Sequence, residues 1–202
     1  MPSYKPYNPL DKKNLGHSIS IALTEQPALP LDGLDKFNGA GIYMIYYTGD
    51  FPPYQKISEK NVDNAFEVPI YVGKAIPSGA RKGGNLEGSV PKPMLHGRLR
   101  EHASSIKAAE NLDINDFYCR FLVVDDIWIP LGEQLAIASF APIWNHLIDG
   151  FGNHDPGKGR YKQAISKWDV LHPGREWATR LPARAETQEQ IAQEVEAHLA
   201  SR

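Results

Sequence analysis

Apolar side chains gather in three short runs that predict β-strands. The run 41–47 (Gly-Ile-Tyr-Met-Ile-Tyr-Tyr) is β-branched and aromatic, and the turn residues 48–50 close it. This composition favours a strand buried in a core. A second run, 68–72, ends at Gly73, and a third covers residues 117–124. We therefore expect two strands that form a hairpin and a third strand later in the chain.

Two segments have the spacing of amphipathic helices. Apolar residues recur on one helical face between residues 94 and 111. A second helix is expected to start near Pro130, because proline fits a first helical turn, and to end before Pro142. The order of hairpin, helix, strand and helix predicts an α+β fold, with a small three-stranded antiparallel sheet flanked by helices.

The length of 202 residues suits one well-buried core rather than two independent enzyme domains. We expect an N-terminal arm (1–36) with room for one short strand or helix at its apolar stretch 19–23, a catalytic core (37–148) and a C-terminal extension (149–202) within one compact domain. The extension holds a Gly-rich basic loop and a terminal helix with Ile191 and Val195 on its apolar face. That helix face fits packing on its own subunit as well as it fits a dimer contact.

Composition is that of an ordinary soluble globular protein. No run of eighteen apolar residues occurs, and the N-terminus lacks the apolar core of a signal peptide. We therefore expect a soluble cytoplasmic protein. The single cysteine, Cys119, has no partner for a disulfide or a Cys-based zinc site, and its apolar neighbours favour a buried strand thiol.

The net charge of -2 argues against a strongly basic nucleic-acid binder, but the charges are unevenly distributed. Between residues 74 and 107 there are seven Lys or Arg against two acids, Glu87 and Glu101. A second basic stretch covers residues 150–180, and the chain ends in an acidic tail. Two basic segments and an acidic tail can give a near-neutral protein one positive face.

Four side chains on predicted strands and helices could carry chemistry. Tyr43 and Tyr71 lie in apolar strands, where a tyrosine is more often a packing residue than a catalytic one. Arg98 and His102 are four residues apart on one predicted helix, so they share a face. They could present a cation and a proton acceptor to one point, although a solvated helix face explains such a pair equally well.

Two later residues are equally ambiguous when taken alone. Glu133 lies near the start of an apolar helix, where the helix dipole favours a carboxylate without any function. Asn145 follows Pro-Ile-Trp and could serve as a turn or cap residue.

The joint pattern resembles the GIY-YIG nuclease family. Gly41-Ile42-Tyr43 on a first strand and Tyr71-Val72-Gly73 on a second are followed by the helical Arg and His, by Glu133 and by Asn145, in the family's order. The resemblance covers roughly residues 37–148 and is closest to type II restriction endonucleases, whose arginine helix carries a histidine. Two departures stand out: the motif tyrosines are 28 residues apart, so 50–67 is an insertion, and valine replaces the usual isoleucine.

The resemblance implies a role for each of these residues in phosphodiester hydrolysis. Tyr43 would take the proton from the attacking water, and His102 would accept that proton in turn. Arg98 would clamp the scissile phosphate. Glu133 would bind one divalent cation, Mg²⁺ with Mn²⁺ as a substitute, to stabilise the leaving 3′ oxygen. Tyr71 and Asn145 would position phosphate and water or hold the geometry of the site.

DNA binding is expected from two segments, 79–93 and 153–162, that combine basic residues with glycine. The alternative is that both are solvated loops. The 50–67 insertion could serve either recognition or dimer contact. A symmetric recognition site would require a homodimer, because each subunit carries one set of catalytic groups. The predicted DNA-binding residues are Lys74, Arg81, Lys82, Lys92, Asn153, His154, Lys158, Arg160 and Lys162.

The function expected from the resemblance is a bacterial type II restriction endonuclease. It would cut duplex DNA at a short palindromic, GC-rich site and leave 5′-phosphate and 3′-hydroxyl ends. One alternative is a structure-specific or repair-type nuclease of the same family that acts as a monomer. Another is a DNA-binding module that keeps the fold without catalysis.

Overall fold

The computed structural model describes residues 8, 10–77 and 92–201 of the chain. The strands are β1 (Leu29–Pro30), β2 (Gly41–Tyr47), β3 (Tyr71–Ala75) and β4 (Phe117–Val123). The α-helices are α1 (Lys12–Thr24), α2 (Gln55–Ser58), α3 (Met94–Ala108), α4 (Ile129–Phe140), α5 (Ile143–His146), α6 (Lys167–Leu171) and α7 (Gln188–Ala200). Short 3-10 turns are η1 (Pro52–Tyr54), η3 (Ile114–Asp116), η4 (Asp126–Trp128), η5 (Lys158–Arg160) and η6 (Glu176–Arg180).

The predicted small antiparallel sheet with flanking helices is confirmed, but it has four strands instead of three. The order is β1-β4-β2-β3, with β2 paired to both β3 and β4. The extra strand comes from the N-terminal segment, where Leu29 and Pro30 pair with Cys119 and Tyr118. A two-residue strand that contains a proline has no periodicity for sequence reasoning to detect, and its place at the sheet edge is where proline is tolerated.

Both faces of β2 are buried, which explains its continuous apolar sequence. Successive strand residues point to opposite faces, so one strand contributes to two cores. The first core receives Tyr43, Ile45 and Tyr47. The second core receives Ile42, Met44 and Tyr46.

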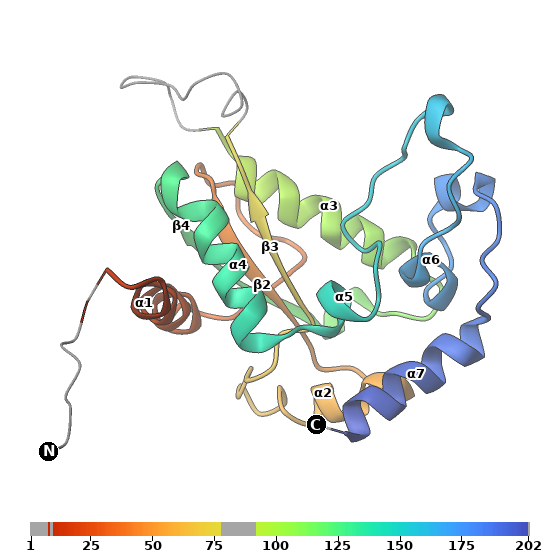
Figure 1. Ribbon diagram of the computed structural model, residues 1–202, viewed down its shortest axis with the longest axis horizontal. Helices are drawn as coiled ribbons and strands as arrows, with labels where there is room; N and C mark the ends of the chain where they lie inside the picture. Colours follow the sequence, from red (N-terminus) through yellow and green to blue (C-terminus); the bar gives the residue numbers. More distant parts are fainter. Residues whose placement is uncertain (1–7, 9, 78–91, 202) are drawn as a thin grey trace, which may run out of the picture.

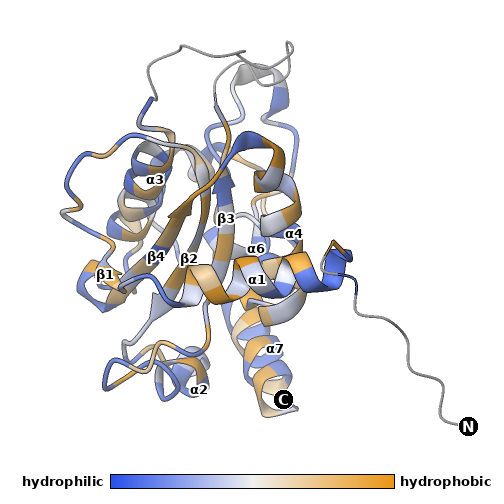
Figure 2. Cartoon of the chain, turned by 90° about the vertical axis from the view of Figure 1, so that its left-hand side faces the viewer, coloured by the Kyte–Doolittle hydropathy of each residue, from blue (hydrophilic) through white to orange (hydrophobic). Residues whose placement is uncertain are grey.

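Helices cover the sheet on both sides. Figures 1 and 2 show α3 on one side of the sheet and α1 and α4 on the other. Helix α1 packs closely on α4 because Gly16 has no side chain: a Cβ there would lie 2.7 Å from Leu135 Cδ1. The segment expected to be an N-terminal arm therefore includes a helix that belongs to the second core, through the fully buried Leu23.

The insertion between the two tyrosine motifs packs against the C-terminal extension. It forms η1 and α2, and Tyr54 in η1 is fully buried, with its hydroxyl 2.6 Å from His172 Nε2. Helix α7 lies along the same region (Figure 1). Its residues Ile191 and Val195 are fully buried within the single chain, so its apolar face is already covered by its own subunit.

Cys119 lies on β4 and is fully buried, as its apolar neighbours indicate, and burial raises the pKa of its thiol to about 12. Among the helices of the described residues, none combines the length and the apolar character that a bilayer-spanning segment needs.

Candidate active site

The hydroxyl of Tyr43 lies 2.6 Å from Nε2 of His102, in the core between the sheet and α3. Tyr43 is the third residue of β2 and points to the α3 face. His102 is in the middle of α3, and both side chains are 1% exposed. The strand and the helix therefore bring together two residues that are 59 positions apart in the sequence.

Burial keeps both members of this pair neutral. It raises the pKa of Tyr43 well above its usual value; the nearby Tyr71 raises it further, and the charge of Arg98 lowers it. Burial also lowers the pKa of His102 well below its usual value, and the Arg98 charge acts in the same direction. A neutral imidazole can accept a proton through Nε2 when its proton is on Nδ1. The pair is thus a phenol that can donate to a free ring nitrogen.

The glycines of both motifs are required by close contacts. Gly73 pairs with Tyr43 across β2 and β3, and a Cβ on Gly73 would lie 2.3 Å from the Tyr43 hydroxyl oxygen. A Cβ on Gly41 would lie 2.0 Å from the carbonyl oxygen of Leu122. Any side chain at Gly73 would displace the Tyr43 ring and its hydroxyl.

Arg98 lies one helical turn before His102 on the same face of α3. Its NH2 donates to the carbonyl oxygen of Gly152 at 2.9 Å, and its NH1 pairs with Glu101 at 2.9 Å and contacts Nε2 of His154. The guanidinium also influences both motif tyrosines, because its charge lowers the pKa of Tyr71, which burial raises. It is the permanent positive charge beside the two phenols.

Glu133 approaches the site from the opposite side of the sheet. It projects from α4 and forms an ion pair with Lys74 of β3, with 2.6 Å between Nζ and Oε2. Lys74 pairs with Ile42 and so faces α4, whereas its neighbour Gly73 pairs with Tyr43 and faces α3. Because β3 is the edge strand, the candidate site extends around this edge and takes side chains from both layers.

A divalent cation fits the chemistry of Glu133. Its side chain is 20% exposed and already holds one cationic group, the Lys74 ammonium. Among the described residues, no cluster of three or more His, Cys, Asp or Glu side chains could hold a metal. One carboxylate completed by water and phosphate oxygens is a shell that Mg²⁺ accepts. Glu133 is therefore the residue that would hold such an ion.

Asn145 pairs with the free edge of β3. Its Oδ1 accepts from the backbone N–H of Val72 at 2.8 Å, and its Nδ2 donates to the carbonyl oxygen of Val72 at 2.9 Å. The carboxamide replaces a neighbouring strand at the middle residue of the second motif. Asn145 holds the segment that carries Tyr71 and Gly73.

Sequence reasoning missed the part played by Phe151 and Gly152. The Phe151 ring stacks on the His102 ring, with centroids 4.5 Å apart and planes 17° apart, and meets Tyr71 edge-on at 4.9 Å. A Cβ on Gly152 would lie 2.9 Å from the Tyr71 hydroxyl oxygen. The Gly-Phe-Gly sequence was the only signal, since glycines around an aromatic residue permit such close approach.

The predicted DNA-binding residues fall into three groups. Lys74 and His154 contact the site residues Glu133 and Arg98 directly. Exposed side chains away from these contacts are Lys92, Asn153, Arg160 and Lys162. Arg81 and Lys82 lie outside the described residues, as does the side chain of Lys158.

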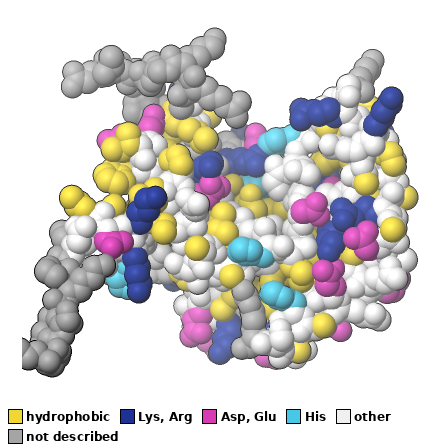
Figure 3. Space-filling view, viewed as in Figure 1, with side chains coloured by type: hydrophobic (Ala, Val, Ile, Leu, Met, Phe, Trp, Pro, Cys, Tyr) yellow, Lys and Arg dark blue, Asp and Glu magenta, His cyan; other side chains and the backbone are white. Residues whose placement is uncertain are grey.

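Figure 3 shows a hollow between the sheet side of the molecule and the protruding segment around η5. Lys, Arg and His side chains are visible at its base beside acidic ones, and further Lys and Arg side chains lie on the protruding segment. Positive charge on the base and on one wall is suited to an anionic substrate.

Comparison with known proteins identifies the family. No curated protein matches the sequence. One family model, the Eco29kI GIY-YIG domain, matches residues 35–199, which includes both tyrosine motifs, α3, α4 and most of the C-terminal extension. Nucleases of this type hydrolyse DNA and generally use divalent metal ions. The chain therefore belongs to the Eco29kI GIY-YIG domain family of restriction-type nucleases.

Proposed function

We propose that this protein is a type II restriction endonuclease that hydrolyses duplex DNA at a short palindromic site. The observation that carries the proposal is the buried Tyr43–His102 pair beside Arg98, with Glu133 on the other side of the edge strand. A proton acceptor, a fixed cation and a metal-binding carboxylate are the groups that phosphodiester hydrolysis needs.

In the proposed reaction, Tyr43 transfers protons without being deprotonated beforehand. Burial holds its pKa well above the usual value, so a resident phenolate is disfavoured. The hydroxyl oxygen of Tyr43 accepts a proton from the attacking water as its own proton passes to His102 Nε2, 2.6 Å away. The neutral state of His102 makes it able to accept that proton near neutral pH.

Arg98 binds the scissile phosphate through its guanidinium. In the DNA-free protein this group pairs with Glu101, whose side chain is 54% exposed. A phosphate would replace that exposed partner, and the Gly152 carbonyl contact would keep the guanidinium oriented. The divalent ion held at Glu133 supplies charge neutralisation for the leaving 3′ oxygen when bound.

DNA would be bound in the hollow of Figure 3. Basic side chains on the η5 segment, Arg160 and Lys162, would contact the backbone, and Asn153 and His154 would reach base edges. Each subunit has one set of catalytic groups, so cutting both strands of a palindrome requires two copies. We propose a homodimer on DNA.

The experiment that tests this function is digestion of a large phage DNA with the purified protein. We expect discrete fragments with Mg²⁺ or Mn²⁺, complete loss of cutting with chelator, and one shared palindrome when fragment ends are sequenced. Random smearing at low enzyme, or cutting confined to branched DNA, would replace restriction with the structure-specific alternative. Absence of cutting with either metal would contradict nuclease function.

A further inference from the structure

The loop 150–154 contacts the site through the Phe151 ring, the Gly152 carbonyl and the His154 side chain, which contacts Arg98. Phe151 covers the His102 ring, with centroids 4.5 Å apart. The carbonyl oxygen of Gly152 accepts from Arg98 NH2 at 2.9 Å. One of these contacts is made by backbone, so it depends on where the loop lies. Whatever holds the loop therefore sets the orientation of two site residues.

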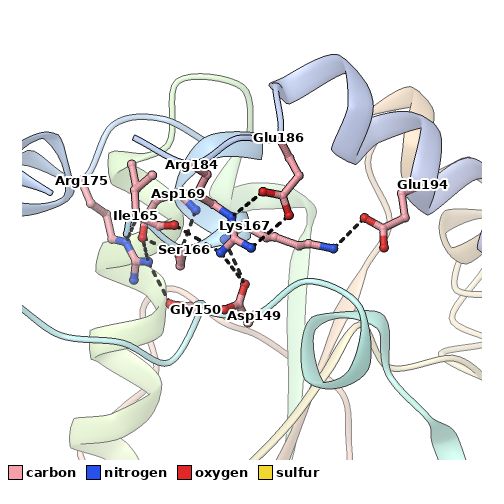
Figure 4. Close-up of polar contacts among 10 residues, drawn as sticks. All are labelled: Asp149, Gly150, Ile165, Ser166, Lys167, Asp169, Arg175, Arg184, Glu186 and Glu194. Atoms are coloured by element: carbon pink, nitrogen blue, oxygen red, sulfur yellow. Dashed lines mark hydrogen bonds and ion pairs between the residues drawn. The ribbon is translucent and has the colours of Figure 1, made fainter. Parts of the chain in front are cut away.

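The guanidinium of Arg175 binds the loop carbonyls from behind, while the Phe151 ring packs on Trp144 and Trp168. Arg175 NH1 donates to the carbonyl oxygens of Phe151 and Asn153, both at 3.1 Å, and its NH2 donates to that of Gly150 at 2.9 Å. Figure 4 shows the Arg175 side chain directed at Gly150 and at Asp169. Three of the five loop carbonyls thus bind one side chain.

Arg175 is itself fixed by a buried ion pair. Its Nε donates to Asp169 Oδ1 at 2.6 Å and its NH2 to Oδ2 at 2.8 Å, with both side chains almost fully buried. Ser166 donates to Asp169 Oδ2 at 2.7 Å, and the Trp168 ring lies 4.5 Å from the guanidinium carbon. A lysine could keep the charge, but one ammonium cannot reproduce the fork that joins a carboxylate to three carbonyls.

We infer that Arg175 is a positioning residue for DNA cleavage, which fixes the 150–154 loop and, through it, the Arg98 guanidinium and the His102 ring. The inference rests on the proposed nuclease function. Arg175 is only 4% exposed, so it would act through the loop and not by contact with DNA. Misplacement of a catalytic group by about 1 Å can cost on the order of a hundredfold in rate. Asn153 and His154 are in the same loop, so DNA binding also weakens, but Arg160 and Lys162 lie outside the loop and keep the loss of affinity smaller than the loss of rate.

The test compares Arg175→Lys with a matched control, Arg120→Lys. Arg120 also lies over aromatic rings, 5.3 Å from that of Tyr46, and donates to a backbone carbonyl, that of Phe66 at 3.3 Å. It belongs to the opposite face of the sheet, away from the loop, because Tyr46 is in the second core. Both variants lose a guanidinium fork, but only Arg175→Lys releases the loop.

Single-turnover cleavage in Mg²⁺ and DNA affinity in Ca²⁺ are measured well below the melting temperature of each variant. We expect Arg175→Lys to lower the cleavage rate constant at least about tenfold, with a smaller factor of loss in DNA affinity, and Arg120→Lys to leave both unchanged. A normal rate for folded Arg175→Lys, or equal losses in the two variants, would overturn the inference. If Arg175→Lys does not fold, Ser166→Ala takes its place, with a smaller loss of the same kind expected.

A second readout keeps this inference separate from the proposed function. The stacked Phe151 ring shields the His102 ring protons, so the imidazole resonance of His102 in ¹H–¹³C spectra reports the loop position without DNA. We expect it to move downfield in Arg175→Lys and to stay in place in Arg120→Lys. An unmoved resonance in Arg175→Lys would overturn the inference, whereas a wild-type protein that cuts no DNA would overturn only the proposed function.

Discussion

The Tyr43 hydroxyl and His102 Nε2 are 2.6 Å apart in a buried pair whose members are both held neutral. The raised pKa of Tyr43 disfavours a mechanism that starts from a phenolate. The lowered pKa of His102 leaves Nε2 available as the proton acceptor. In the proposed reaction, Tyr43 therefore acts as a neutral phenol that passes a proton from water to the imidazole, and not as an ionised base.

The pH dependence of kcat/KM should reflect the lowered His102 pKa. In the proposed reaction the neutral imidazole is the active form, so activity should be lost only when pH falls below the folded pKa, which lies well below the usual 6.5. We expect kcat/KM to stay level as pH falls through 6.5 and to decline only at lower pH, since this parameter reports the free enzyme. Initial rates at low substrate over pH 4.5–8 measure it. An acid limb centred at or above 6.5 would contradict a neutral buried His102.

The buried His172 should make folding stability depend on pH. Burial lowers its pKa from 6.5 to about 3, so between these values the unfolded chain binds a proton that the folded chain excludes. Stability from this group is complete above pH 6.5 and decreases as pH falls towards 3, by up to about 1.4 kcal/mol per pH unit. Urea unfolding at pH 7, 6 and 5 measures the slope.

His172→Gln is the comparison for this prediction, because glutamine does not titrate. Its stability is expected to be lower at pH 7, where the Tyr54 and Asn111 contacts of His172 are lost. Its stability should also fall less steeply than that of the wild type between pH 6.5 and 5. Parallel slopes in the two proteins would show that His172 is not buried in its neutral form.

If Glu133 holds the divalent ion, as proposed, Lys74 competes with that ion for the carboxylate. The ammonium lies 2.6 Å from Oε2, and the proposed metal binding would weaken this ion pair. We expect Lys74→Met to bind Mn²⁺ more tightly in the absence of DNA, by up to about fivefold, the size of a partly exposed ion pair. Calorimetric titration measures this affinity. Unchanged or weaker binding would remove Lys74 from the metal site.

Glu133→Ala is the partner experiment. It should abolish Mn²⁺ binding and DNA cutting, while DNA affinity measured without divalent ions does not fall, because a metal-free carboxylate adds no attraction for phosphate. Retained cutting would exclude Glu133 as the metal ligand.

The sequence predicted the elements that have strong local signals. The continuous apolar run of β2, the period of α3 and the proline at the start of α4 each identified an element to within a few residues. The two tyrosine motifs also identified the family, because several residue types in a fixed order are far more specific than any one of them. Strand β1 was missed because two residues at an edge carry no pattern.

The contacts that hold the site residues in place could not be predicted from the sequence, because they join segments that are far apart in the chain. Arg175 donates to backbone carbonyls of the 150–154 loop, such as that of Gly150. An arginine in the sequence does not reveal which backbone carbonyls it will bind. Tyr54 lies in an insertion that sequence reasoning left open between recognition and dimer contact, yet it is buried against His172. Such contacts follow from how the C-terminal extension folds back, which local residue patterns do not encode.

A second tyrosine–histidine pair in the molecule provides a control for the proposed role of the Tyr43 hydroxyl. The Tyr54 hydroxyl lies 2.6 Å from His172 Nε2, the same distance as in the Tyr43–His102 pair, and Tyr54 is also fully buried. Burial raises the pKa of both tyrosines. Only the Tyr43 pair lies beside Arg98, so loss of either hydroxyl costs stability, but only one loss should affect chemistry.

Single-turnover cleavage by Tyr43→Phe and Tyr54→Phe is the most direct test of this account. Each variant loses one buried hydroxyl and is expected to be less stable by roughly 1–3 kcal/mol. Below their melting temperatures, Tyr43→Phe should cut about a hundredfold more slowly or worse, and Tyr54→Phe should cut at the wild-type rate. A near-normal rate for Tyr43→Phe would contradict the account and leave Tyr43 as a packing residue of the core.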